Sequence, residues 1–436
     1  MNWAGGRAAL GGALLSVAAA ALLSAQGPVR PYKSQIAVDH PAVAAIAPAG
    51  DAVARLAARL DRGEVTLEGG ASGAGEHGQG ALRAVLAALD VPIDSQVLVF
   101  SKTSVQAAHI SPARPRAIYF RDDVLVAHVP GTPGLEVIAI DAARGPAFYA
   151  LTAGAGGVAT FTASHTCLKC HHGPNTAGVP GVFVGSVVPG PGGAPLRDDT
   201  AIITDHRSPF AERWGGWFVT ARRGEPPSRA NALAASPADR AALVREVPRN
   251  VTTLAGLVDA SAYLAPTSDI VALMTLEHQT QMQNLLTRVA WQARVAEAAT
   301  PGAARAFAGL TADLEDLVDY LTFADEVRLP AAVEGVSAFT ATFEQRGPTD
   351  RQGRSLRDFD LRTRLFRYPV SYLLLSPMVD ALPGEVRTEI YRRVYARLTS
   401  AAPARPGGPA LADRRAAIAI VHDTARAVPS FWRLPK

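Results

Sequence analysis

The sequence predicts an α+β protein with a β-rich N-terminal half and a mainly helical C-terminal half. Its 436 residues are 48% hydrophobic and 19% charged, which suits a globular protein with a sizeable core. Short apolar runs, separated by Pro, Gly and Asp turn signals, fill the stretch from residue 96 to residue 151. From about residue 237 onward, apolar residues instead recur at helical spacing. We therefore expect a β-rich region over residues 27–235 and a helical region over residues 236–436 packed against it.

The first 26 residues have the pattern of a signal peptide or an N-terminal anchor. Arg7 precedes a run of about sixteen apolar residues, as in a secretion signal. Small Ala25 suits a cleavage site and Leu23 does not, so cleavage and an uncleaved anchor over residues 4–23 both stay open. We expect export to the periplasm, and contact with the inner membrane only through an uncleaved segment.

Charge and cysteine content narrow the function classes. The net charge of +4 comes from basic residues dispersed along the chain, so we expect no nucleic-acid partner. The chain has 2 cysteines, Cys167 and Cys170, and an exported protein with so few does not build its fold from disulfides. The pair must therefore have a local role.

Two amphipathic helices are expected before the strands. In residues 51–63, Val53 and Leu56 share one face and Gly63 ends the helix. Residues 80–90 repeat this spacing. The apolar runs that follow predict strands at 96–100, 116–120, 124–129, 135–140 and 147–151, with further strands at 182–188 and 216–221.

The C-terminal helices begin after a Ser cap at Ser236. A long helix is predicted over 267–298, because its pattern runs unbroken to Pro301 and Gly302. Further amphipathic runs predict helices at 303–327, 383–398 and 410–427.

Residues 167–171 read Cys-Leu-Lys-Cys-His, which is the C-x-x-C-H spacing of c-type haem attachment. Two thiols one helical turn apart can add to the two vinyl groups on one edge of a porphyrin. The next side chain, His171, then offers an imidazole nitrogen to the iron as the proximal ligand. We expect a short helical turn that opens at about Thr166, and one covalent haem c held by Cys167, Cys170 and His171.

Two other kinds of site share these residues. A thioredoxin-like redox pair needs C-x-x-C near the start of a helix in a βαβ unit, and the Gly-rich flanks lack that pattern. A zinc site needs four ligands, so His165, His172 or more distant side chains would have to join the cysteines.

On this motif the chain resembles the c-type cytochromes. The blocks at residues 204–217, 276–286 and 361–374 are also similar to an exported group of bacterial monohaem proteins without an assigned activity. The resemblance implies haem-based electron transfer with periplasmic redox proteins as partners. It does not extend to the small cytochrome fold, because about 140 residues of mixed, strand-rich sequence precede the motif.

The sixth ligand of the iron decides what such a haem does. Met274, His278 and Met282 recur at intervals of four residues and so share one helix stripe. His278 is the first candidate, for bis-His ligation, and either methionine would give a higher potential. The competing interpretation is an ordinary core stripe with one hydrogen-bonded histidine.

His206 and Arg207 form a second candidate group, beside Asp205 and shortly before Trp214 and Trp217. Arg207 could pair with a haem propionate, because a guanidinium suits a carboxylate. If the iron is open instead, His206 would serve as a general base and Arg207 as a charge-stabilising cation. A turn held by its own ion pairs explains the same residues without any function.

Two functions follow from these observations. The first is electron transfer by a periplasmic monohaem c-type cytochrome, which the haem motif itself favours. The alternative is a haem c-dependent peroxidase or oxidase with an open sixth iron position, which the length of the chain favours, because a shuttle needs far fewer residues.

Overall fold

The computed structural model of the protein describes residues 33–48, 50–67, 79–132, 134–153, 159–196, 201–236, 239, 243, 248–300, 303–400 and 408–434. The predicted leader at residues 1–26 and most of the helix expected after Ser236 lie outside these residues. The α+β prediction is confirmed, with an antiparallel sheet in the N-terminal half and helices in the C-terminal half. Within the described ranges, no helix is both long enough and apolar enough to cross a membrane.

The main sheet contains seven antiparallel strands in the order β6-β5-β4-β3-β2-β1-β9. Six follow one another as a meander: β1 (Val97–Val99), β2 (Arg116–Phe120), β3 (Val124–His128), β4 (Leu135–Asp141), β5 (Gly145–Ala153) and β6 (Ala159–Ala163). β9 (Trp217–Phe218) returns later in the chain and pairs with β1. β7 (Val184–Ser186) and β8 (Ile202–Thr204) form a separate two-stranded sheet.

Both faces of the main sheet are buried. Side chains alternate along each strand, so Ile118 and Leu125 join the larger hydrophobic core while Tyr119 and Val126 join the second. α3 (Ala52–Asp61) and α4 (Gln79–Ala88) contribute to the second core. We call their side of the sheet the α4 face, and the side of Ile118 and Leu125 the α6 face.

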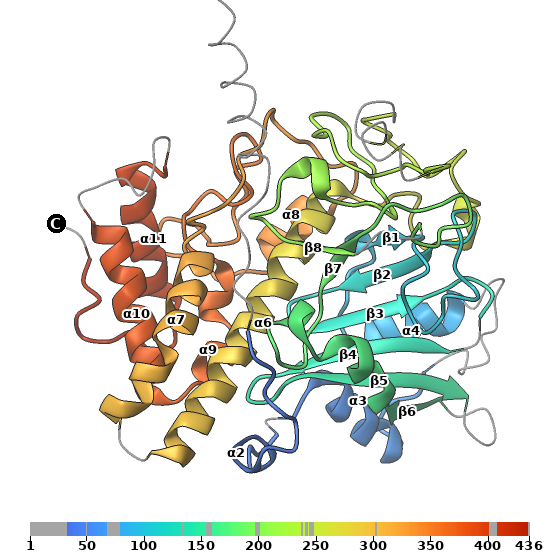
Figure 1. Ribbon diagram of the computed structural model, residues 1–436. Coiled ribbons are helices and arrows are strands. Elements are labelled where there is room, and N and C mark those ends of the chain that lie inside the picture. The colour runs from blue at the N-terminus through green and yellow to red at the C-terminus, as the bar shows by residue number, and fades with distance from the viewer. Residues whose placement is uncertain are drawn as a thin grey trace, which may run out of the picture.

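Helix α6 (Ile270–Ala299) packs against the α6 face and is buried on every side from Ile270 to Trp291. Its first turn is capped by Asp269, whose carboxylate accepts hydrogen bonds from two backbone N–H groups. The burial follows from its position, because the sheet lies on one side of α6 and the other long helices lie on the opposite side (Figure 1).

The remaining helices complete the C-terminal half. α7 (Ala303–Leu321) packs along α6, and α10 (Gly384–Thr399) packs on both α7 and α11 (Leu411–Thr424). The short helices α8 (Phe339–Gln345) and α9 (Pro377–Asp380) also contact α6. Residues from the sheet and from these helices belong to one hydrophobic core, so the two predicted regions are fused rather than separate.

Two strands were not expected from the sequence, β6 and β8. β6 reads Ala-Thr-Phe-Thr-Ala next to a Gly-rich stretch, so its apolar signal is weak. It forms a strand because it pairs with β5, a contact that the local sequence does not indicate. β6 is the edge strand of the main sheet and leads directly into the cysteine motif.

Candidate functional site

The C-x-x-C-H segment forms the expected helical turn at the end of β6. Residues His165–Cys167 form a 3-10 turn, and Leu168–His171 continue it as α5. The thiols of Cys167 and Cys170 are not bonded to each other, and Cys170 is exposed. Cys167 Sγ lies 3.4 Å from Ser164 Oγ. The turn therefore presents both thiols and the following imidazole from one short segment at the rim of the sheet.

The ring of His171 is held so that only one nitrogen is engaged by the backbone. Its Nδ1 lies 2.9 Å from the carbonyl oxygen of Gly181, and the Gly181 N–H donates to the His171 carbonyl at 2.8 Å. A carbonyl only accepts, so Nδ1 carries the proton and Nε2 is left as the basic nitrogen. Burial lowers the pKa of His171, which favours the neutral ring that a metal needs.

The position of Gly181 is fixed from α6. Asn284 accepts a hydrogen bond from the Val182 N–H at 3.0 Å and donates one to the Val182 carbonyl at 2.8 Å. A Cβ atom at Gly181 would lie 2.2 Å from Asn284 Oδ1, so this close approach requires glycine. Helix α6 thus sets the orientation of His171 through Asn284 and Gly181, the kind of outer support that ligating histidines require.

Cys167, Cys170 and His171 line one cavity between α5 and the α6 face of the sheet. Its empty space is about 1210 Å³, a figure that includes the part open to solvent. Helix α6 contributes Leu276 and Thr280 to the wall. Most lining side chains are apolar, among them Val99, Ile118, Leu125, Ile138, Phe148 and Phe183. The cavity therefore offers a mainly apolar space, partly open to solvent, beside the motif.

One ion pair interrupts the apolar wall. Arg116 on β2 and Glu136 on β4 both line the cavity, and Arg116 Nη1 lies 2.9 Å from Glu136 Oε2. Strand β3 runs between them and places the small side chain of Ala127 beside Glu136, which lets the long arginine reach across. In the described part of the chain, the Nε atom of Arg116 is buried and has no hydrogen-bond partner.

The predicted sixth ligand, His278, lies away from the cavity. It is fully buried on α6, with Nδ1 at 2.8 Å from His206 Nδ1 and Nε2 at 2.8 Å from Ser371 Oγ. Both ring nitrogens are therefore engaged, and neither His206 nor His278 is among the cavity-lining residues. The two candidates from the sequence, His206 and His278, therefore contact each other and do not lie beside His171 in the cavity.

Arg207 is also placed away from the cavity. Its guanidinium pairs with Asp205 and Asp316, each at 3.0 Å, and lies over the ring of Tyr320. A turn held by its own ion pairs was one interpretation of the sequence, and the Arg207–Asp205 pair is a contact of that kind.

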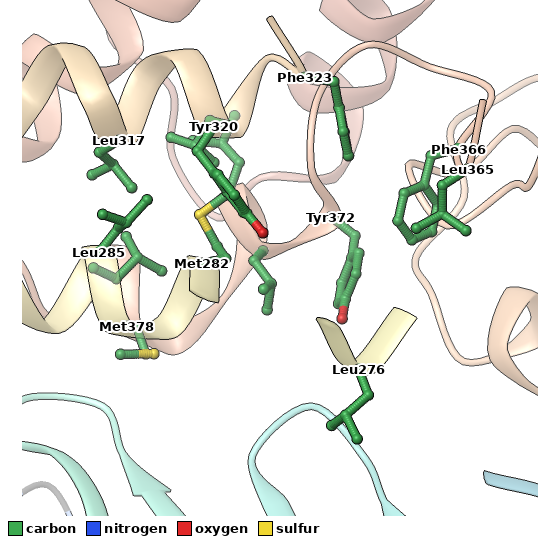
Figure 2. Close-up of a cluster of buried hydrophobic side chains, with 14 of the residues drawn as sticks. Leu276, Met282, Leu285, Leu317, Tyr320, Phe323, Leu365, Phe366, Tyr372 and Met378 are labelled. Carbon is green, nitrogen blue, oxygen red and sulfur yellow. The ribbon is translucent and has the colours of Figure 1, made fainter. Parts of the chain in front are cut away.

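The two methionines of the stripe belong to the hydrophobic core. Figure 2 shows Met282 among Leu285, Leu317 and Tyr320, in the contact between α6 and α7. Met274 is 3% exposed and, like Met282, does not line the cavity. Among the described cavity-lining residues, His171 is the sole histidine and none is a methionine or a lysine.

The surroundings of the cysteine pair can be compared with what a thioredoxin-like redox pair and a zinc site require. The strand before the motif is part of an antiparallel meander, whereas a thioredoxin-like pair sits in a βαβ unit. In the part of the chain that the structure describes, no three or more His, Cys, Asp or Glu side chains are grouped to hold a metal ion.

Sequence reasoning missed Arg116, Glu136, Gly181 and Asn284. The two charges had a usable signal, because strand alternation puts Arg116 on the same face as Ile118, and Glu136 on the same face as Ile138. A charged side chain on an apolar strand face indicates a site. Gly181 and Asn284 had no such signal in the sequence, because their contact joins segments about 100 residues apart.

A scan against protein-family models and searches among curated proteins and solved structures found no match to this chain.

Proposed function

We propose that the chain is an exported monohaem c-type protein that binds haem in this cavity. The observation that carries the proposal is the placement of Cys167, Cys170 and His171 on one wall of a mainly apolar cavity, with His171 Nε2 left as the basic nitrogen. Export to the periplasm rests on the leader pattern of residues 1–26.

The donor set fits haem c. Cys167 and Cys170 would each hold the haem through a thioether to one vinyl group, a bond that needs no oxidant because the thiol adds as a whole across the double bond. His171 supplies its neutral Nε2 to the iron, and the Gly181 carbonyl keeps the ring oriented. When bound, the haem supplies an iron that exchanges one electron and binds small ligands. The apolar lining excludes water, which influences the reduction potential.

The lining favours an open sixth position over bis-His or His/Met ligation. Of the described residues that line the cavity, only His171 is a strong iron ligand of the kind that cytochromes use. An open position supports ligand binding or peroxidase or oxidase chemistry. Because His206 and Arg207 lie elsewhere, Glu136 is the acid–base group of the cavity on which such chemistry would draw.

Electron transfer is the second candidate, with periplasmic redox proteins as partners. The exposure of Cys170 favours it, because a thioether at the protein surface suits electron exchange through the haem edge. The two functions can be told apart with carbon monoxide, because an iron with an open sixth position binds it and an iron with two protein ligands does not.

The test is the absorption spectrum of reduced protein purified from periplasm, after co-expression with a cytochrome c maturation system. We expect carbon monoxide to shift the Soret band at once, because the sixth position is open. An unchanged spectrum from haem-loaded protein would show a second protein ligand and would favour the electron-transfer function. His278→Phe is the matched control, because this change should leave the response to carbon monoxide as in the wild type.

A further inference from the structure

The ion pair of Arg116 and Glu136 on the cavity wall has more hydrogen-bond donors than it uses. An arginine guanidinium carries five N–H donors in two forks. In Arg116, Nη1 donates a hydrogen bond to Glu136. The Nε atom on the opposite edge of the guanidinium is buried without a partner among the described residues. The free fork is therefore the one formed by Nε and Nη2.

Such an arrangement is costly unless something else accepts the hydrogen bond. A buried donor without a partner is destabilising, and more so when it is charged. The carboxylate that matches an arginine fork accepts two parallel hydrogen bonds. Glu136 holds the guanidinium from one side only, so a second carboxylate would complete the site.

Arg116 is the only arginine among the described cavity-lining residues, and no lysine lines the cavity there. Its charge also reaches His171. Beyond the effects of burial and of the Gly181 hydrogen bond, Arg116 lowers the pKa of His171 and Glu136 raises it. The pair is thus electrically close to the group that would ligate the iron.

We propose that Arg116 binds a propionate carboxylate of the haem through its Nε and Nη2 donors, and that Glu136 positions the guanidinium. This inference rests on the proposed haem c binding. It replaces the sequence-based assignment of Arg207, whose guanidinium is occupied by Asp205 and Asp316. Because attachment depends on Cys167 and Cys170, loss of Arg116 leaves the haem in place and changes only how its propionate is held.

The experiment compares Arg116→Gln with Arg114→Gln in full-length, haem-loaded protein. Arg114 is exposed, lies two residues earlier and does not line the cavity, so its loss removes the same charge outside the site. The readouts are the pyridine haemochrome yield, the propionate bending bands in the resonance Raman spectrum, and the midpoint potential.

We expect both variants to carry wild-type amounts of covalent haem. Arg116→Gln should shift the propionate bending bands and lower the midpoint potential, because a cation that stabilises the ferrous state is lost. Arg114→Gln should behave as the wild type. Glu136→Gln should raise the potential, because it removes the opposing charge.

Unchanged propionate bands in Arg116→Gln would overturn the inference, even if the potential falls, because the charge would then act without contacting the propionate. If that variant does not load haem, Arg116→Lys serves instead. It keeps the charge and loses the fork, so the bands should still shift while the potential stays close to that of the wild type. Wild-type bands in Arg116→Lys would overturn the inference. No covalent haem in any variant, the wild type included, contradicts the proposed function itself.

Discussion

Two histidines of this protein, His171 and His278, differ in what their ring nitrogens can still do. His171 uses Nδ1 for the Gly181 carbonyl, keeps Nε2 as its basic nitrogen and lines a cavity together with two thiols. His278 uses both nitrogens, for His206 and Ser371, and stacks against Tyr320 and Phe323. The partial burial of His171 and the full burial of His278 do not by themselves distinguish a ligand from a core residue. The free nitrogen and the space in front of it make that distinction.

The largest expected effect comes from replacing each of these two histidines with alanine and comparing the haem spectra of the two variants. His171→Ala should abolish the wild-type haem spectrum because the proximal ligand is lost, whereas His278→Ala should leave the spectrum of the attached haem unchanged. Absorption spectra of the oxidised and reduced proteins measure this. A spectrum altered by His278→Ala and not by His171→Ala would reverse the assignment.

The buried histidine pair should make stability sensitive to acid. Burial lowers the pKa of His278 to about 3, from an ordinary value of 6.5. Between these values the unfolded chain binds a proton that the folded chain does not. The free energy of unfolding therefore falls as the pH falls from 6.5 toward 3, by about 1.4 kcal/mol per pH unit for this side chain.

Urea unfolding at several pH values, compared between the wild type and His278→Gln, measures this dependence. The variant lacks the titrating ring, so its stability should fall less steeply below pH 6.5. Carboxylates common to both proteins cancel in the difference. Parallel curves would contradict the assignment of a neutral, buried His278.

A smaller effect is expected at Asn284, which connects the two regions. Asn284→Ala leaves the Val182 N–H and carbonyl without their partner and should cost about 2 kcal/mol of unfolding free energy. It should also broaden or shift the haem spectrum, because Gly181 no longer fixes the His171 ring. Thr275→Ala is the control on the same helix, because the Thr275 hydroxyl donates to the Val271 carbonyl within α6 and the residue does not line the cavity. An equal change of the haem spectrum in this control would contradict the claim that Asn284 orients the His171 ring.

The smallest effect is expected at His172, next to the proximal histidine. Its Nε2 is 2.9 Å from the Ile36 carbonyl and its Nδ1 is 3.2 Å from Gln35 Nε2, so it holds the N-terminal segment. His172→Ala should cost about 1 kcal/mol in urea unfolding and leave the haem spectrum unchanged. Loss of haem attachment in this variant would instead assign His172 to the site.

The sequence predicted the elements with strong periodicity. The helix expected over 383–398 is α10, and the strand expected over 116–120 is β2 with the same bounds. The stripe of Met274, His278 and Met282 could not be placed in the same way. Because α6 is buried on every side, a stripe with helical spacing does not show which neighbour it faces.

The candidate site was predictable where it is local. Cys167, Cys170 and His171 lie within one helical turn, so their spacing alone brings them together. The other wall depends on tertiary contacts, because Arg116 and Glu136 meet across a third strand. The sequence showed a charged residue on each apolar strand face, but not that the two faces were one wall of the same cavity.

Covalent attachment of haem is the central claim, and the intact mass of the exported protein tests it most directly. Wild-type protein, purified from periplasm and unfolded in acid, should carry the mass of one haem and give a c-type pyridine haemochrome. The Cys167→Ala/Cys170→Ala double variant should lack that mass while it remains folded. Correctly exported wild-type protein without covalent haem would contradict the account.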